Sequence, residues 1–96
     1  MNKYEMMFIV KSSNEESDVK KVADSVSKVA KDNKAKNIEM KELGLKKLAY
    51  PIKKEINGYY YLLTFEAEKE TIVELDRKTS INENVIRHLI IRKEEE

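Results

Sequence analysis

The sequence predicts an α+β fold in which two helices cover one face of a four-stranded antiparallel sheet. Four segments are rich in aromatic and β-branched residues, as strands are, and two segments carry apolar residues at helical spacing. These segments follow one another in the order βαββαβ. The chain has 96 residues, about the size of one small domain. We therefore expect a single domain over residues 1–96 with a short acidic C-terminal end.

The first strand is expected over residues 3–10, KYEMMFIV, which is too short for a typical helix. Ser13 and Glu16 then have the spacing of a capping box, which predicts a helix start. The apolar residues that follow recur at steps of three and four, as on one side of an amphipathic helix: Val19, Val22, Ala23, Val26, Val29 and Ala30.

A long second strand is expected from about residue 38 to Ile52, with a bulge at Gly44, where the alternation of apolar residues breaks. Pro51 cannot donate a hydrogen bond, so this strand belongs at an edge of the sheet. The Asn57-Gly58 pair favours a hairpin turn, with the third strand over residues 58–67.

A shorter helix is expected between Glu68 and Thr79, and a last strand over residues 84–93, NVIRHLIIRK. The resulting order is that of the ferredoxin-like split βαβ motif. Right-handed crossovers would place the first and third strands in the centre and the second and fourth at the edges. Pro51 would then lie on an edge strand, where a sheet tolerates proline.

Alternation along the two central strands indicates which side chains meet the helices. The wholly apolar or aromatic sets are assigned to the core: Tyr4, Met6, Phe8 and Val10, and Tyr59, Tyr61, Leu63 and Phe65. In the last strand two sets compete: Ile86, His88 and Ile90 against Val85, Arg87, Leu89 and Ile91. Burying a neutral histidine costs less than burying an arginine, so we expect Arg87 to point outward.

The opposite, open face of the sheet would then carry six apolar side chains: Met7, Ile9, Tyr60, Leu62, Leu89 and Ile91. Six in one place exceed ordinary surface scatter and indicate a protein-partner face. The alternative is that a small two-layer fold simply leaves part of its sheet exposed.

Composition narrows the classes of function. Lys and Arg number 19 and Asp and Glu 18, so any attraction to nucleic acid must come from a local patch. The chain has no cysteine and so no disulfide framework, which is most typical of an intracellular protein. No apolar stretch approaches the roughly 20 residues that span a bilayer. We expect a soluble, cytoplasmic protein without a membrane partner.

Motifs for catalysis or metal binding are lacking in the sequence. His88 is the single histidine and has no cysteine or spaced carboxylate cluster to join it, so it is interpreted as a packed strand residue. Gly44 and Gly58 are the two glycines, too few for a Gly-rich phosphate loop such as the anion loop of acylphosphatase, which shares this fold. We therefore expect no enzyme, no metal, no cofactor and no small-molecule substrate.

The three consecutive tyrosines suggest an alternative, an RNA-recognition-motif-like module that stacks single-stranded RNA on its third strand. The segment NGYYYLLTF departs from that module's pattern at three positions: Asn57, Tyr60 and Thr64.

Several motifs together resemble the bacterial ribosomal protein S6 family. They are ELGLKKLAYPI followed by INGYYY, the start MNKYE, and NVIRHLIIR near the end. The resemblance implies a ferredoxin-like structural protein of the small ribosomal subunit. It further implies binding to 16S ribosomal RNA in the central domain, or platform, together with ribosomal protein S18.

The resemblance also implies roles for individual residues. Lys46 and Lys47 correspond to the family's basic pair, and four more residues to its basic strand-end positions: Lys3, Arg87, Arg92 and Lys93. We expect these six to contact phosphates and sugars, which position a protein without reading sequence. Tyr60 and Leu62 match a pair on the partner face. Unlike several relatives, this chain has no arginine in TSINENVI, residues 79–86.

Overall fold

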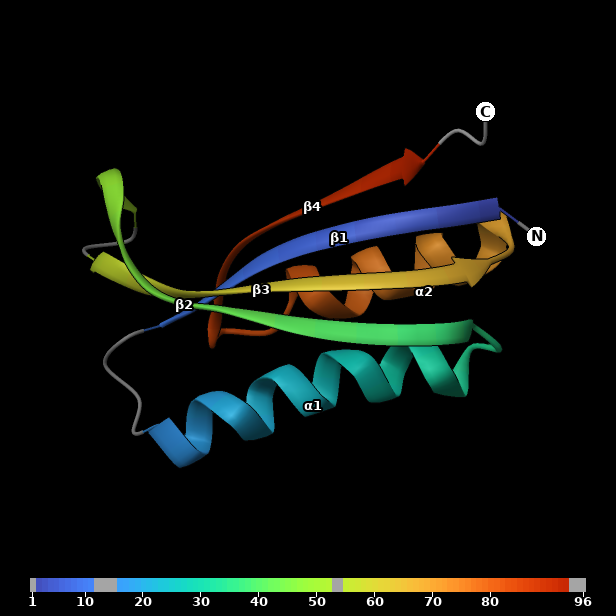
Figure 1. Ribbon diagram of the computed structural model, residues 1–96, viewed down its shortest axis with the longest axis horizontal. Coiled ribbons are helices and arrows are strands. Elements are labelled where there is room, and N and C mark those ends of the chain that lie inside the picture. Colours follow the sequence, from blue (N-terminus) through green and yellow to red (C-terminus); the bar gives the residue numbers. More distant parts are fainter. Residues whose placement is uncertain (1, 12–15, 53–54, 94–96) are drawn as a thin grey trace.

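The computed structural model describes residues 2–11, 16–52 and 55–93. Its helices and strands follow one another in the order that the sequence predicts (Figure 1). Their bounds are β1 Asn2–Lys11, α1 Glu16–Asp32, β2 Lys36–Ile52, β3 Glu55–Ala67, α2 Lys69–Ser80 and β4 Val85–Lys93. The expected capping box at Ser13 and the glutamates at the C-terminal end lie outside the described residues.

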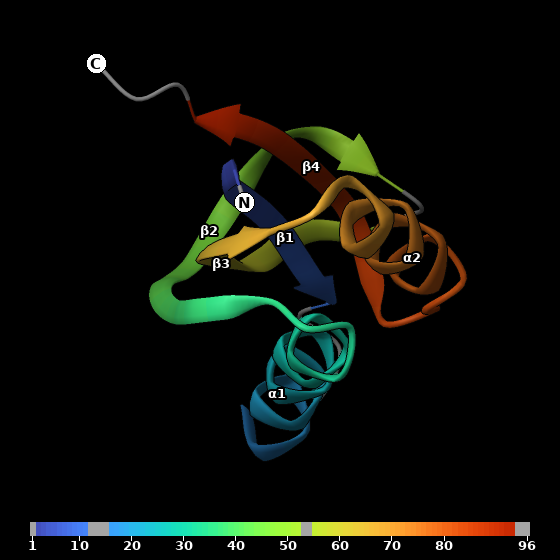
Figure 2. The same ribbon diagram turned by 90° about the vertical axis from the view of Figure 1, so that its right-hand side faces the viewer.

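The four strands form one sheet in the order β2-β3-β1-β4, and the three neighbouring pairs are antiparallel. Both helices lie on the same side of this sheet (Figure 2). The predicted ferredoxin-like fold, with β1 and β3 in the centre, is therefore confirmed. Pro51 belongs to the edge strand β2, as its missing donor requires.

The main core lies between the sheet and the helices and contains the predicted side chains. Met6, Phe8 and Val10 of β1 are fully buried, and the ring of Phe8 stacks on that of Tyr61 at 5.4 Å between centroids. Apolar residues of α1 close this core from the other layer: Val19, Ala23, Val26 and Ala30. Tyr59, also assigned to the core, is only partly buried against it.

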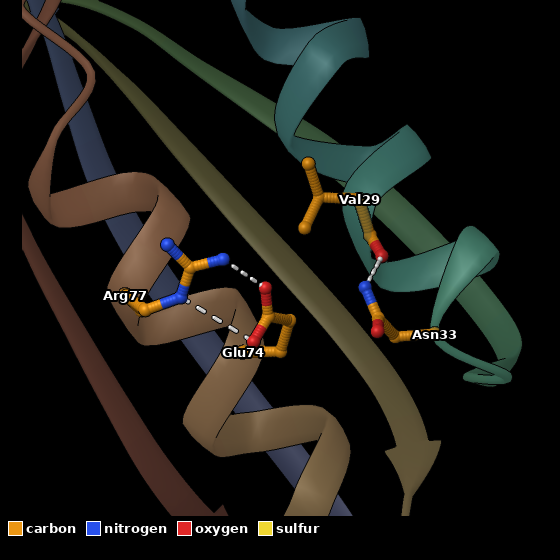
Figure 3. Close-up of polar contacts among 4 residues, drawn as sticks. All are labelled: Val29, Asn33, Glu74 and Arg77. Atoms are coloured by element: carbon orange, nitrogen blue, oxygen red, sulfur yellow. Dashed lines mark hydrogen bonds and ion pairs between the residues drawn. The ribbon is translucent and has the colours of Figure 1, made fainter.

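A buried threonine ties the two helices together. The hydroxyl of Thr71, in the first turn of α2, donates to the carbonyl of Asn33 at 2.6 Å. The side-chain amide of Asn33 in turn donates to the carbonyl of Val29 in α1 at 2.8 Å (Figure 3). On the exposed side of α2, Arg77 hydrogen-bonds Glu74 and thereby lowers the pKa of that carboxyl (Figure 3).

The predicted bulge at Gly44 is confirmed. The pairing of β2 with β3 shifts register between Glu42 and Gly44. Gly44 has a φ of +92°, which residues other than glycine rarely adopt. Beyond this point β2 turns out of the line of the sheet, away from the helices (Figures 1 and 2).

The expectation of a hairpin turn at Asn57-Gly58 is wrong. Both residues lie inside β3, where Gly58 pairs with Lys46 of β2 and with Lys11 of β1. A Cβ on Gly58 would come within 2.2 Å of the Ile9 Cγ2. The glycine is therefore needed for close packing of a side chain against the strand and not for a turn.

Strand β4 also departs from simple alternation. A register shift beside Ile9 and Val10 brings Val85 opposite Val10 and leaves Ile86 unpaired. Val85 therefore joins the main core and Ile86 packs on the opposite face, the reverse of the expected assignment. From Arg87 onward the prediction is correct: Ile90 packs on the core, and the His88 ring lies 2.7 Å from the carboxylate of Asp76 in α2.

Candidate protein and RNA interface

The open face of the sheet has an apolar centre. Met7 of β1 pairs with Leu62 of β3 on one side and with Leu89 of β4 on the other. The exposed fractions are 40% for Met7, 57% for Leu89 and 51% for Ile91, which are large for apolar side chains. A hollow of about 280 Å³ opens here, lined by Met7, Ile9, Arg87, His88 and Leu89. This is the place on the sheet where a partner could bury apolar surface.

The expectation that all six open-face residues are exposed is wrong for Ile9. Its side chain is only 7% exposed and forms a cluster with Leu48 and Ile86, against which Tyr60 packs. Leu48 reaches Ile9 because β2 curls over the open face beyond Gly44. Tyr60 and Leu62 are half-buried.

The six predicted RNA-contacting residues are all exposed, but they lie in two groups at opposite ends of the sheet. Lys3 pairs with Lys93 at the end where β1 begins and β4 finishes. The Lys93 ammonium lies 3.7 Å from the Glu5 carboxylate, and Arg92 donates to the side chain of Asn2 at 3.2 Å. Positive charge at this end is thus partly offset by a neighbouring carboxylate.

The second group lies about 20 Å away, six residues along the strands. Arg87 sits opposite Ile9, and Lys46 and Lys47 lie in β2 just beyond the bulge. The Lys46 ammonium stands 5.7 Å from the centre of the Tyr60 ring, which places Lys46 on the open face. Lys47, one residue further along the strand, points to the opposite side.

Sequence reasoning missed two residues of this surface, Leu48 and Ile86. The curl of β2 after Gly44 brings Leu48 onto Ile9, and alternation within one strand does not predict a contact between distant strands. Strict alternation with Arg87 pointing outward assigns Ile86 to the core. The bulge in β4 that reverses this assignment has no local signal in the sequence.

The tyrosines do not form the stacking platform that the alternative function requires. Tyr61 is 4% exposed in the main core, and Tyr59 packs on the same side. Tyr60 alone of the three lies on the open face, where Lys46 covers its ring. On β1 the open face carries Met7 and Ile9 in place of aromatic residues.

Other kinds of site find little support in the part of the chain that the structure describes. Its acidic residues and its histidine form no group of three or more able to hold a metal ion. Neither described helix is long and apolar enough to cross a membrane.

Comparison with known proteins decides the family. The family model described as "Ribosomal protein S6" matches residues 3–92. The chain belongs to the ribosomal protein S6 family. It is 39% identical to the "Small ribosomal subunit protein bS6" of Phytoplasma australiense, over 97% of this chain and 100% of that protein. The protein of the same description from Shouchella clausii (strain KSM-K16) is 41% identical, over 99% of this chain and 100% of the relative.

The fold agrees with that of solved S6 proteins. The crystal structure of 30S ribosomal protein S6 from Thermotoga maritima superposes with a TM-score of 0.85 at 26% identity, over 96% of this chain and 87% of that one. The predicted family and the predicted location in the small ribosomal subunit are thus confirmed. As a member of the S6 family, the chain is a ribosomal protein of the small subunit, a structural rather than enzymatic class.

Proposed function

We propose that this S6-family chain binds 16S ribosomal RNA in the platform of the small subunit together with ribosomal protein S18. The open face receives the protein partner, and the exposed lysines and arginines at the two ends of the sheet contact RNA phosphates. The apolar centre supports this division most strongly. Met7, Leu89 and Ile91 expose apolar surface on neighbouring positions of β1 and β4, and Glu5, which lies opposite Ile91, borders this surface toward Lys93.

Charge supports a joint rather than an independent RNA interface. The net charge is +1, and Lys93 already lies beside Glu5. A protein with so little excess positive charge has weak long-range attraction to RNA, so its binding depends on the contacts of local groups of cations. A partner that covers the apolar centre and adds phosphate contacts of its own would raise the affinity of both.

Substitution of Leu89 by aspartate tests the partner face. Leu89→Asp should weaken S18 binding about tenfold or more, because a charge in an apolar interface loses its hydration. Val73→Asp is the matched control, since Val73 is 62% exposed on α2 in the other layer. Titration calorimetry with purified S18 gives both affinities, and circular dichroism checks that both variants are folded.

Equal affinities of the two variants for S18 would show that the open face does not receive it. The alternative, single-stranded RNA binding by the tyrosines, predicts a different result. In that case the isolated chain would bind short single strands tightly, and Tyr60→Ala would abolish the binding.

A further inference from the structure

The end of the β2-β3 hairpin is fastened to the sheet by a small second core. We call this segment the hairpin arm; it comprises residues 45–52 of β2 and 55–58 of β3. Leu48 is 5% exposed and clusters with Ile9 and Ile86 on the face opposite the helices. Gly58 makes room for this cluster, because a Cβ there would overlap Ile9 and lie 3.6 Å from the Ile86 Cδ1. Leu48 is thus the arm's buried anchor among its described side chains.

The arm joins the rest of β2 at a point that can bend. Gly44 adopts φ +92°, and a Cβ built on it meets nothing within 4 Å. The register with β3 shifts at this residue and again between Lys47 and Ile52. Of the described side chains of the arm, only that of Leu48 is buried. A segment with a bulge at its base and few buried side chains opens more easily than the central strands. The direction of the arm therefore depends on the docking of Leu48.

Leu48 follows directly after the two lysines of the arm. Lys46 shares its face and stands over Tyr60, which itself packs on the Leu48 cluster. Lys47 points the other way from the same stretch of strand. Where Leu48 docks, the backbone at both lysines takes a fixed position relative to Arg87 across the sheet.

We propose that Leu48 is a positioning residue that docks the hairpin arm on Ile9 and Ile86 and so preorganises Lys46 and Lys47 for RNA. The RNA part of this proposal rests on the proposed function. Ile9 also lines the hollow at the centre of the open face. A partner side chain in that hollow therefore contacts the residue that holds Leu48, and partner binding favours the docked arm. By linkage, RNA bound to the docked arm favours the partner equally.

The docking step is tested by hydrogen exchange on the full chain without RNA. In Leu48→Ala, the amides of the arm should exchange faster while those of β1 keep their protection. Leu45→Ala is the matched control, because Leu45 lies three residues away in the same arm and is 54% exposed. Unchanged protection of the arm in Leu48→Ala would overturn the docking.

The positioning step is tested with a transcript of the 16S central domain in the presence of S18. Leu48→Ala should bind about tenfold more weakly than the wild type, because loss of preorganisation weakens binding while the lysines remain. In a Lys46→Ala/Lys47→Ala background the same change should have almost no further effect, since residues that act through one another are not additive. Leu45→Ala should leave the affinity unchanged in both backgrounds.

The outcomes separate the two proposals. A tenfold loss of RNA affinity in the Lys46→Ala/Lys47→Ala background as well would show that Leu48 acts through something other than these two lysines. That result would overturn the positioning role. No binding of the transcript by the wild type with S18 would overturn the proposed function and the RNA part of this inference. The exchange result decides the docking of the arm in either case.

Discussion

At the scale of single residues, Gly58 shows how a sequence signal and its physical cause can differ. Asn-Gly is a strong hairpin signal because both residues tolerate positive φ. Here the useful property of Gly58 is its missing side chain, which leaves space for Ile9. The local sequence around Gly58 does not show which residue needs this space, because Ile9 lies in another strand, 49 positions earlier. Gly44, by contrast, was correctly predicted as a bulge because its cause, a break in alternation, is local.

Gly58→Ala should lower the free energy of unfolding by about 1–3 kcal/mol, because the new methyl group overlaps the Ile9 Cγ2 and the packed strands cannot separate freely. Ile9→Ala removes that atom. The double variant should therefore lose less stability than the sum of the two single changes. Urea unfolding of all four proteins measures this coupling. Additive losses would mean that the glycine is required for its backbone conformation and not for the space it leaves.

At the scale of elements, short-range patterns were sufficient to predict which helices and strands form. The six elements, their order and the alternation of β1 follow from periods of two and of 3.6 residues. The same patterns failed at Val85 and Ile86, because one unpaired residue in β4 reverses the faces without altering the local composition. The tie between the helices was also beyond reach, since Thr71 and Asn33 are 38 positions apart.

That tie makes a prediction about the attachment of α2. Thr71→Val keeps the shape of the side chain but removes the donor to the Asn33 carbonyl, and should lower the free energy of unfolding by about 1–2 kcal/mol. Thr71→Ser keeps the hydroxyl and should lose less. Thermal unfolding by circular dichroism compares the three proteins. If valine were no more destabilising than serine, the hydrogen bond of Thr71 would contribute no more to stability than its methyl group.

At the scale of the whole molecule, the site could be only partly predicted. Alternation correctly identified Met7, Leu89 and Ile91 as exposed on one face, because it depends on strand period alone. It could not show that the arm covers Ile9 or that the cations separate into two groups, since both depend on how β2 bends and how strand ends align. The apolar centre and the two separate cationic ends therefore became visible only in three dimensions.

This arrangement allows the charge of the arm to be removed separately from that of the other end. In complex with S18, Lys46→Ala/Lys47→Ala should reduce the slope of log affinity for the 16S central domain against log salt by about 1–2, since each lost phosphate contact lowers it by somewhat less than one. Lys20→Ala/Lys21→Ala on α1 removes the same charge from exposed positions in the helix layer and should leave the slope unchanged. Filter binding over a range of salt concentrations measures both slopes. Equal slopes for the two double variants, both reduced, would assign the effect to net charge. An unchanged slope for the arm variant would mean that Lys46 and Lys47 serve only to keep the exposed edge of β2 from pairing with other strands.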